Sequence, residues 1–182
     1  MLQGAKKDPQ LIMSNWQKQQ DLIEGVVLRE VLHVPGDRGV ITEMFRFDWD
    51  PHGHPVSQVY QSRVFPGLVA AWSCHLKSVD RLFVNQGFMK FVLYDDREES
   101  KTYGQLNEFH IGDARPALLI IPTGVWHGLK NLGPSDCLLT NLPTKAYNYE
   151  DPDHYRLPRD TPKIPYRWFG PATPSAPDPL KE

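Results

Sequence analysis

The chain has 182 residues, a formal net charge of −2, and acidic and basic residues interspersed along its length. This length predicts one domain with a hydrophobic core of its own, and the balanced charge gives no electrostatic basis for binding nucleic acid or an anionic membrane. The first ten residues lack an apolar signal-peptide core, and no run reaches the about 20 apolar residues of a membrane span, so we expect a cytoplasmic protein with small-molecule partners.

Taken in chain order, residues 1–22 are predicted to form a partly helical extension, because apolar residues between Pro9 and Leu22 recur near helical spacing. From residue 23 to 168, short runs rich in β-branched and aromatic residues are separated by Gly, Pro or charged turns, without helical segments between them. This pattern predicts an antiparallel β-sandwich or barrel. The predicted strands are 25–34, 39–47, 57–64, 67–76, 81–95, 105–111, 117–122, 125–132 and 137–142.

The C-terminal end has a different composition. The last 31 residues contain eight prolines, and proline removes a hydrogen-bond donor from a strand ladder. We therefore expect residues 169–182 to form a poorly ordered, Pro-rich tail.

The stretch AWSCHLKSVD, residues 71–80, places a thiol, an imidazole and a carboxylate close together. Residues two apart on a strand point to the same face, so we expect Ser73 and His75 on one face and Cys74 on the other. Cys74 and Cys137 have neither zinc nor redox spacing, and we expect both to be reduced, buried thiols.

Two stretches resemble the motifs of the cupin superfamily. The first motif, G-(X)5-H-X-H-(X)3,4-E-(X)6-G, is matched in spacing by Gly67, Ser73, His75, Asp80 and Gly87. Ser73 replaces the first histidine of that motif and Asp80 replaces its glutamate. The second motif, P-X-G-(X)2-H-(X)3-N, is matched throughout by Pro122, Gly124, His127 and Asn131. The resemblance implies an all-β fold of the cupin type, a double-stranded β-helix or jelly-roll barrel.

A longer resemblance, to the dTDP-4-dehydrorhamnose 3,5-epimerase family, runs from about Ile23 to Trp168. It is carried by IEGVVLREVLHVPGDRGVITEMF, DDREESKTYG, IIPTGVWHGL and YNYEDPDHYRLPRDTPKIPYRW, which occur in the order of that family's segments. The resemblance implies epimerisation or isomerisation of a 4-keto-deoxysugar nucleotide by proton transfer next to the ketone. It also implies a homodimer whose ligand is a nucleotide-activated deoxyhexose, with no cofactor and no metal.

The resemblance assigns binding roles to several positions. It implies that Arg38 contacts the nucleotide diphosphate and that Glu43 and Gln58 help to hold the nucleotide or sugar. The planar guanidinium group of arginine suits a diphosphate. Three further residues are candidates for substrate binding. Tyr60 and Trp72 could form an aromatic wall for a base or sugar, and Ser73 is a small neighbour.

The family's catalytic run GVLRGLH aligns without gaps on GLVAAWS, residues 67–73. Its substrate-binding arginine becomes Ala70 and its catalytic histidine becomes Ser73, while the tyrosine that returns a proton falls near Thr140. Removing a proton next to a ketone needs a base whose pKa lies near the working pH. A serine hydroxyl cannot be that base unaided.

His75 lies one pleat along on the same face and is the predicted general base. Asp80 would orient or ionise it, and His127 would polarise the substrate. Two alternatives stay open, and one of them is not an enzyme. The first alternative is a non-catalytic module that binds a nucleotide sugar. The second is a metal-dependent cupin in which His75, Asp80 and His127 bind Fe(II), Mn(II) or Zn(II).

Overall fold

The computed structural model of the chain describes residues 20–169. The tail from residue 170 onward lies outside this range, and so does most of the predicted N-terminal helix; residues 20–22, its described part, are not helical. Within residues 20–169 the chain forms twelve strands and one short 3-10 helix, η1 (Phe47–Trp49).

No helix in the described part of the chain is long and apolar enough to cross a membrane.

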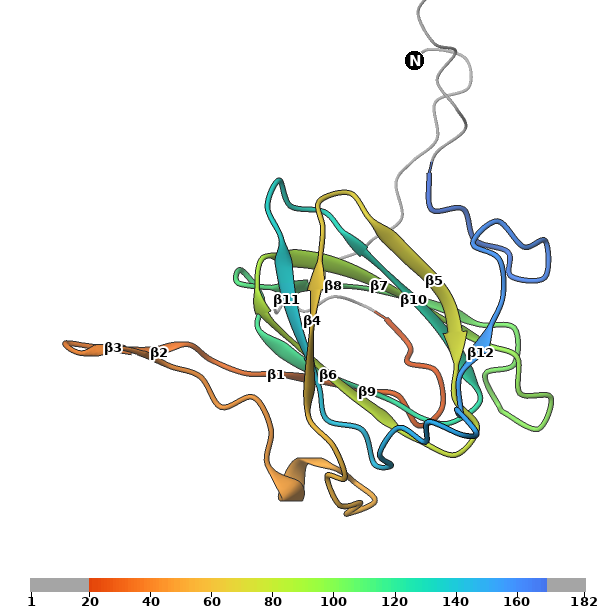
Figure 1. Ribbon diagram of the computed structural model, residues 1–182, viewed down its shortest axis with the longest axis horizontal. Helices are drawn as coiled ribbons and strands as arrows, with labels where there is room; N and C mark the ends of the chain where they lie inside the picture. Colours follow the sequence, from red (N-terminus) through yellow and green to blue (C-terminus); the bar gives the residue numbers. More distant parts are fainter. Residues whose placement is uncertain (1–19, 170–182) are drawn as a thin grey trace, which may run out of the picture.

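Two five-stranded antiparallel sheets face each other and enclose the core (Figure 1). The first sheet has the order β1 (Val27–Glu30), β9 (Ala117–Ile121), β6 (Asp80–Gln86), β11 (Cys137–Asn141), β4 (Tyr60–Val64). The second has the order β12 (Tyr155–Arg156), β5 (Val69–Cys74), β10 (Val125–Asn131), β7 (Phe88–Asp95), β8 (Leu106–Gly112). This jelly-roll barrel confirms the predicted all-β, cupin-type fold.

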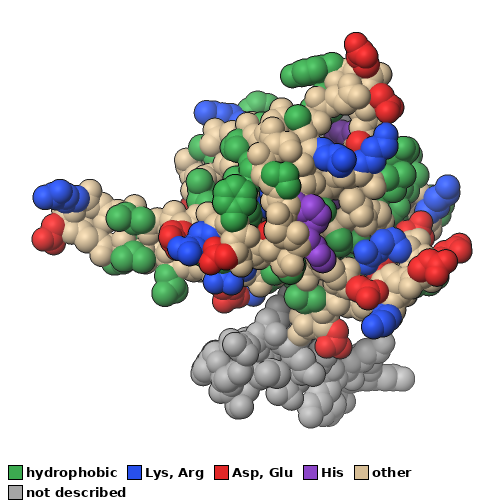
Figure 2. All heavy atoms as spheres, turned by 90° about the horizontal axis from the view of Figure 1, so that it is seen from below, with side chains coloured by type: hydrophobic (Ala, Val, Ile, Leu, Met, Phe, Trp, Pro, Cys, Tyr) green, Lys and Arg blue, Asp and Glu red, His purple; other side chains and the backbone are tan. Residues whose placement is uncertain are grey.

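A separate hairpin, β2 (Val34–Gly36) and β3 (Gly39–Ile41), projects away from the barrel (Figure 1). Seen from below, it stands out from the body of the molecule and carries hydrophobic and charged side chains (Figure 2). Val34, Val40 and Ile41 are 58%, 61% and 73% exposed. The hairpin therefore contributes nothing to the core of its own barrel.

Alternate residues of the strands fill the barrel. Met89, Phe91 and Leu93 of β7 all belong to the interior cluster, as the two-residue period of a strand requires. A second cluster covers the outer face of the β5–β10–β7 sheet, where Trp168 of the C-terminal segment packs. Gly128 makes this packing possible, because a Cβ there would lie 2.6 Å from the Trp168 ring.

The predicted strands overlap the observed ones, with four differences. The single run predicted for residues 81–95 is two strands, β6 and β7, which turn at Gly87 with a φ of 92°. The run 25–34 contains only β1 and the start of β2, and the run 39–47 contains only β3 before the chain leaves the hairpin. β12 was not predicted. Cys74 and Cys137 are buried free thiols, which confirms that prediction, and burial raises the pKa of Cys74 to about 11.

A buried ion pair joins the barrel to the loop that follows η1. The Arg81 side chain is fully buried on the outer face of β6, where its Nε donates to Asp50 at 2.9 Å and its Nη2 donates to the same carboxylate. It also donates to the carbonyls of His54, Pro55 and Leu142. Burial opposes ionisation of Asp50, but the hydrogen bonds from the His52 amide and Arg81 outweigh it and lower the pKa of Asp50.

Candidate active site

Three side chains predicted to be catalytic meet at one end of the barrel. His75 follows β5, Asp80 begins β6 and His127 lies in the middle of β10. The Asp80 Oδ2 atom lies 3.5 Å from His75 Nε2 and 3.4 Å from His127 Nε2. The two imidazole rings are stacked, with centroids 5.5 Å apart. The carboxylate thus stands between two histidines from the opposite sheet.

The strand pattern explains why these side chains point inward. His127 shares its face of β10 with Val125 and Leu129, which lie in or against the interior core. Asp80 shares its face of β6 with the core residues Leu82 and Val84. The site is therefore the polar end of the same interior that the hydrophobic core fills.

Hydrogen bonds to carbonyl groups set the orientation of both histidines. His75 Nδ1 donates to the carbonyl oxygen of Asp153, and His127 Nδ1 donates to that of Val125 at 3.2 Å. Because a carbonyl only accepts, each Nδ1 carries a proton, and in the neutral ring the lone pair is on Nε2, which faces Asp80. Burial lowers the pKa of His127, although the charge of Asp80 opposes the change.

Trp72 points away from this site, and a bulge in β5 lies next to it. His127 lies opposite Ser73 and Leu129 lies opposite Ala70, so Ala71 and Trp72 share the remaining position between them. Trp72 is fully buried on the outer face, 5.2 Å from the Trp168 ring. The predicted substrate contact of Trp72 is therefore corrected: it is a packing residue, because it is adjacent to Ser73, which faces the site, and neighbouring residues on a strand point to opposite faces.

Two residues of the C-terminal segment that reach the site were not found from the sequence. The Asp153 carboxylate accepts the backbone N–H groups of Leu76, Lys77 and Ser78 at 2.9, 2.7 and 3.0 Å, which ties the β5–β6 loop to the C-terminal segment. His154 packs on His75 with ring centroids 4.9 Å apart.

The other contact of His154 is with Ser73. Its Nε2 lies 3.2 Å from the Ser73 Oγ. Burial lowers the pKa of His154 to about 4, so its ring is neutral at pH 7. The sequence signal for this residue was only its place in the resembling segment YNYEDPDHYRLP, because no motif spacing links it to position 73.

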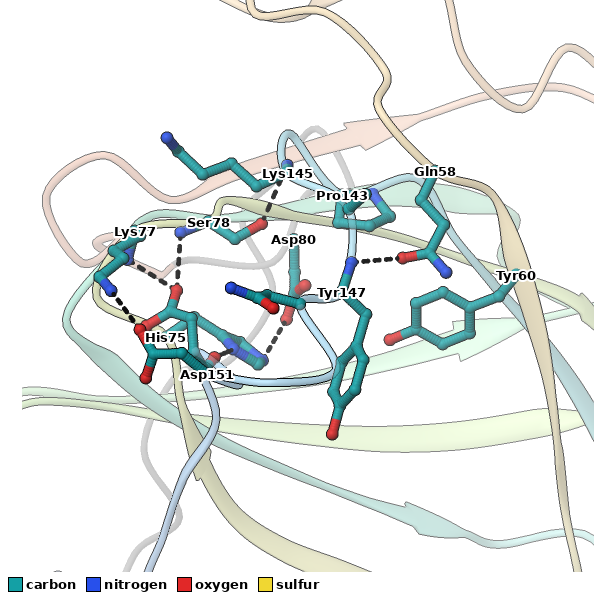
Figure 3. Close-up of a pocket in the computed structure, with 13 residues that line it drawn as sticks. Gln58, Tyr60, His75, Lys77, Ser78, Asp80, Pro143, Lys145, Tyr147 and Asp151 are labelled. Atoms are coloured by element: carbon teal, nitrogen blue, oxygen red, sulfur yellow. Dashed lines mark hydrogen bonds and ion pairs between the residues drawn. The ribbon is translucent and has the colours of Figure 1, made fainter.

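A hollow of about 200 Å³ opens beside His75 and Asp80 (Figure 3). Gln58 and Tyr60 line it from the β4 side, and the segment from Pro143 to Asp153 closes the other side. The Gln58 Oε1 accepts the backbone N–H of Tyr147 at 2.9 Å, which joins these two sides. Gln58 and Tyr60, both predicted to bind substrate, are thus beside the predicted base.

Arg38 and Glu43, two other predicted binding residues, lie elsewhere. Arg38 is exposed in the turn of the projecting β2–β3 hairpin. Glu43 is exposed after the hairpin and lies 3.7 Å from Arg46. Neither lines the hollow of its own chain.

The neighbour of Thr140, not Thr140 itself, faces the site. The Thr140 hydroxyl lies 2.6 Å from Asn85 Oδ1 and donates to it. The Asn141 Nδ2 group instead donates to both Asp80 Oδ1 and the Tyr60 hydroxyl oxygen, each at 2.9 Å. Sequence comparison pointed to this strand, but only the structure shows which of its residues reaches the carboxylate.

No family model matches the chain. Two curated proteins are similar over 147 residues: a probable low-salt glycan biosynthesis epimerase of Haloferax volcanii and the spore coat polysaccharide biosynthesis protein SpsL of Bacillus subtilis. The first is 40% identical, and the match covers 80% of this chain and 94% of that protein. The second is 35% identical, with 81% and 97% covered.

Solved structures show the same fold. A dTDP sugar isomerase from Desulfovibrio desulfuricans G20 is 32% identical, with a TM-score of 0.74 over 82% of this chain and 95% of that chain. The 3'-monoepimerase ChmJ of Streptomyces bikiniensis, solved in complex with dTDP-quinovose, is 21% identical with a TM-score of 0.71 and shares the fold over 80% of this chain and 76% of its own.

Proposed function

Because the chain belongs to the dTDP-4-dehydrorhamnose 3,5-epimerase family of the cupin superfamily, we propose that it epimerises or isomerises a nucleotide-activated 4-keto-deoxysugar. The proposal is carried by one observation: His75 turns its Nε2 toward a carboxylate at the edge of a hollow. The relative named as a dTDP sugar isomerase supports a dTDP-sugar as the substrate. Residues 23–168 form the proposed catalytic domain, and a cytoplasmic location stays a prediction.

In the proposed reaction, His75 removes the proton from the carbon next to the ketone. The C–H electron pair moves into a C=C bond, and the ketone becomes an enolate. The carboxylate of Asp80 stabilises the imidazolium that forms, because it lies 3.5 Å from Nε2. His127 lies on the other side of that carboxylate, with its Nε2 3.4 Å from Asp80 Oδ2, and its role in polarising the substrate stays a prediction.

The hollow is smaller than the about 300–1,000 Å³ of sites that enclose a whole drug-sized ligand. Its volume of about 200 Å³ suits the keto-sugar ring alone. The nucleotide therefore extends over the surface, where the ligand is within reach of side chains that do not line the hollow.

Deuterium exchange tests the function directly. The protein is incubated with dTDP-4-keto-6-deoxyglucose in deuterated water, and the sugar is analysed by NMR and mass spectrometry. We expect deuterium at C3 or C5. Tight binding of the sugar nucleotide without exchange would instead support a non-catalytic binding module.

We also propose that the chain works as a homodimer whose β2–β3 hairpin carries Arg38 to the site of the partner. Support comes from the exposed apolar residues of the hairpin and from its direction away from its own barrel. Packing these residues on a second barrel would bury them, and a two-fold axis would make the exchange mutual.

For Arg38→Ala we expect dTDP affinity to fall about 10- to 100-fold, because a charged hydrogen bond to phosphate is lost. Calorimetry measures the affinity and analytical ultracentrifugation measures the mass. If the site is shared, mixing Arg38→Ala chains with His75→Ala chains restores exchange, since the mixed dimer contains one site with both residues. A monomeric wild-type protein would contradict the proposal.

A metal-dependent cupin is the second candidate function. The ligand atoms of His75, Asp80 and His127 all lie within 4.8 Å of one another, and both histidines are oriented by carbonyl groups, as metal-bound histidines are. Two nitrogen ligands and one oxygen ligand fit Fe(II), Mn(II) or Zn(II), which would supply Lewis-acid or redox chemistry.

Elemental analysis separates the two candidates. Under the proton-transfer function, we expect chelator-treated protein that has lost its transition metal to keep its rate of deuterium exchange. Near-stoichiometric metal in the purified protein, together with loss of exchange on chelation and recovery on adding one metal back, would establish the metal-dependent function instead.

A further inference from the structure

The side chain of Asn141 is buried behind the candidate active site, and its amide can adopt only one orientation. Its Oδ1 accepts the backbone N–H of Arg81 at 3.1 Å, and its Nδ2 donates to Asp80 Oδ1 and to the Tyr60 hydroxyl oxygen, each at 2.9 Å. A backbone N–H can only donate, so the amide oxygen must face Arg81. The amide nitrogen must then face the Asp80 carboxylate.

The pairing of β11 with β6 brings Asn141 to this position. β11 lies between β6 and β4 in the first sheet, and Asn141 lies opposite Leu82, two residues after Asp80. Residues directly opposite each other on paired strands point to the same face, and so do residues two apart on one strand. Asn141 and Asp80 are therefore both directed into the barrel, on neighbouring strands.

The two oxygen atoms of the Asp80 carboxylate have different neighbours. Oδ1 accepts the Asn141 N–H, whereas Oδ2 lies 3.5 Å from His75 Nε2 and 3.4 Å from His127 Nε2. Figure 3 shows Asp80 beside His75 at the hollow. Within residues 20–169, the Asn141 amide is the only hydrogen-bond donor at Oδ1. Because a carboxylate is planar, holding Oδ1 against β11 also holds Oδ2 between the two imidazoles.

We propose that Asn141 is a positioning residue that keeps Asp80 Oδ2 beside the Nε2 atom of His75. This inference rests on the proposed function, in which His75 removes the substrate proton and becomes an imidazolium. A carboxylate next to that ring stabilises its charge, and a carboxylate that has turned away does not. Asn141 itself does not line the hollow. Its effect therefore falls on proton transfer and not on binding of the sugar nucleotide.

Asn141→Ala removes the amide and leaves every residue that lines the hollow in place. At saturating substrate we expect the rate of deuterium exchange to fall about 10- to 100-fold, the scale of misplacing a reacting group by about 1 Å. The affinity for dTDP, measured by calorimetry, should match that of the wild type. A merely structural role of Asn141 would lower the affinity and the rate together.

Asn107→Ala is the matched control. Asn107 is 2% exposed, as Asn141 is, and its side chain also accepts one backbone N–H and donates two hydrogen bonds. It does not line the hollow. Both variants lose a buried amide, so both should unfold at a lower temperature than the wild type. Only Asn141→Ala should exchange deuterium more slowly.

Asn141→Asp is a second variant, which decides the question if Asn141→Ala does not fold. It keeps the shape of the side chain and can still accept the Arg81 N–H. A carboxyl oxygen replaces the donor to Asp80, and the two carboxyl groups repel each other. We expect slower exchange in this variant too, again with unchanged affinity for dTDP.

The inference is overturned if a folded Asn141 variant exchanges deuterium at the wild-type rate, or if its affinity for dTDP falls as much as its rate. A crystal structure of the variant tests the positioning without the reaction. Asp80 Oδ2 should leave its place between the two imidazoles, and an unchanged carboxylate contradicts the inference. A wild-type protein without any exchange contradicts the proposed function instead, so the two failures are distinguishable.

Discussion

His75→Ala is expected to abolish deuterium entry into the substrate and to lower turnover about 10²–10⁴-fold, the contribution of a positioned general base. The reason is the geometry of its ring. Nδ1 donates to the Asp153 carbonyl, so Nε2 alone is left to accept a proton, and Asp80 lies 3.5 Å from it. Initial rates of exchange, followed by NMR at saturating substrate, measure the effect, and dTDP affinity should change little.

His110→Ala is the matched control, because it removes an imidazole on β8 that does not line the hollow. It should exchange deuterium at the wild-type rate. Deuterium exchange that survives in His75→Ala would exclude His75 as the base. The assignment of the fold would then stand, but the proposed role of His75 would not.

Arg81→Met is expected to lower the free energy of unfolding by about 3–5 kcal/mol, the cost of breaking a buried ion pair by removing one partner. The Asp50 carboxylate would be left buried, and the carbonyl groups of His54, Pro55 and Leu142 would each lose a donor. Urea denaturation followed by tryptophan fluorescence gives the free energy.

Arg63→Met provides the comparison. Its partner, Asp136, lies 3.3 Å away, but the Arg63 side chain is 64% exposed, and such surface pairs contribute about 0–1 kcal/mol. The double variant Arg81→Met with Asp50→Asn should lose less free energy of unfolding than the sum of the losses in the two single variants. The reason is that Asp50→Asn removes the charge that Arg81→Met leaves unpaired. A loss below about 1 kcal/mol in Arg81→Met alone would contradict the buried-pair argument.

Most of the predicted strands were recoverable because strand signals are local. β9, for example, is an apolar run that the Pro-x-Gly turn at Pro122 and Gly124 separates from β10, and both strands appear where expected. The motif spacing also identified His75, Asp80 and His127. In the barrel, both histidines lie within 3.5 Å of one Asp80 carboxylate oxygen. These three lie at strand ends or on strands that the cupin motifs describe.

The side of the strand to which Trp72 points follows from alternation, because Trp72 is adjacent to the inward-facing Ser73. The pairing of Ala70 and Ala71 could not be predicted in this way, because alternation holds only while the register is regular and a bulge lies opposite Gly128. The bulge depends on how β5 pairs with β10, more than 50 residues away along the chain. Ser73, which lies just after the bulge, still shares the face of His127 as expected.

By itself, the sequence determined the all-β class, the approximate strands and the family, because turn residues, two-residue periodicity and motif spacing are properties of short segments. Only the tertiary structure decided that Asp153 orients His75, that His154 meets Ser73, and that Asn141 holds the Tyr60 hydroxyl. These pairs are 78 to 81 residues apart. Their contacts depend on the register between non-consecutive strands, which no local pattern specifies.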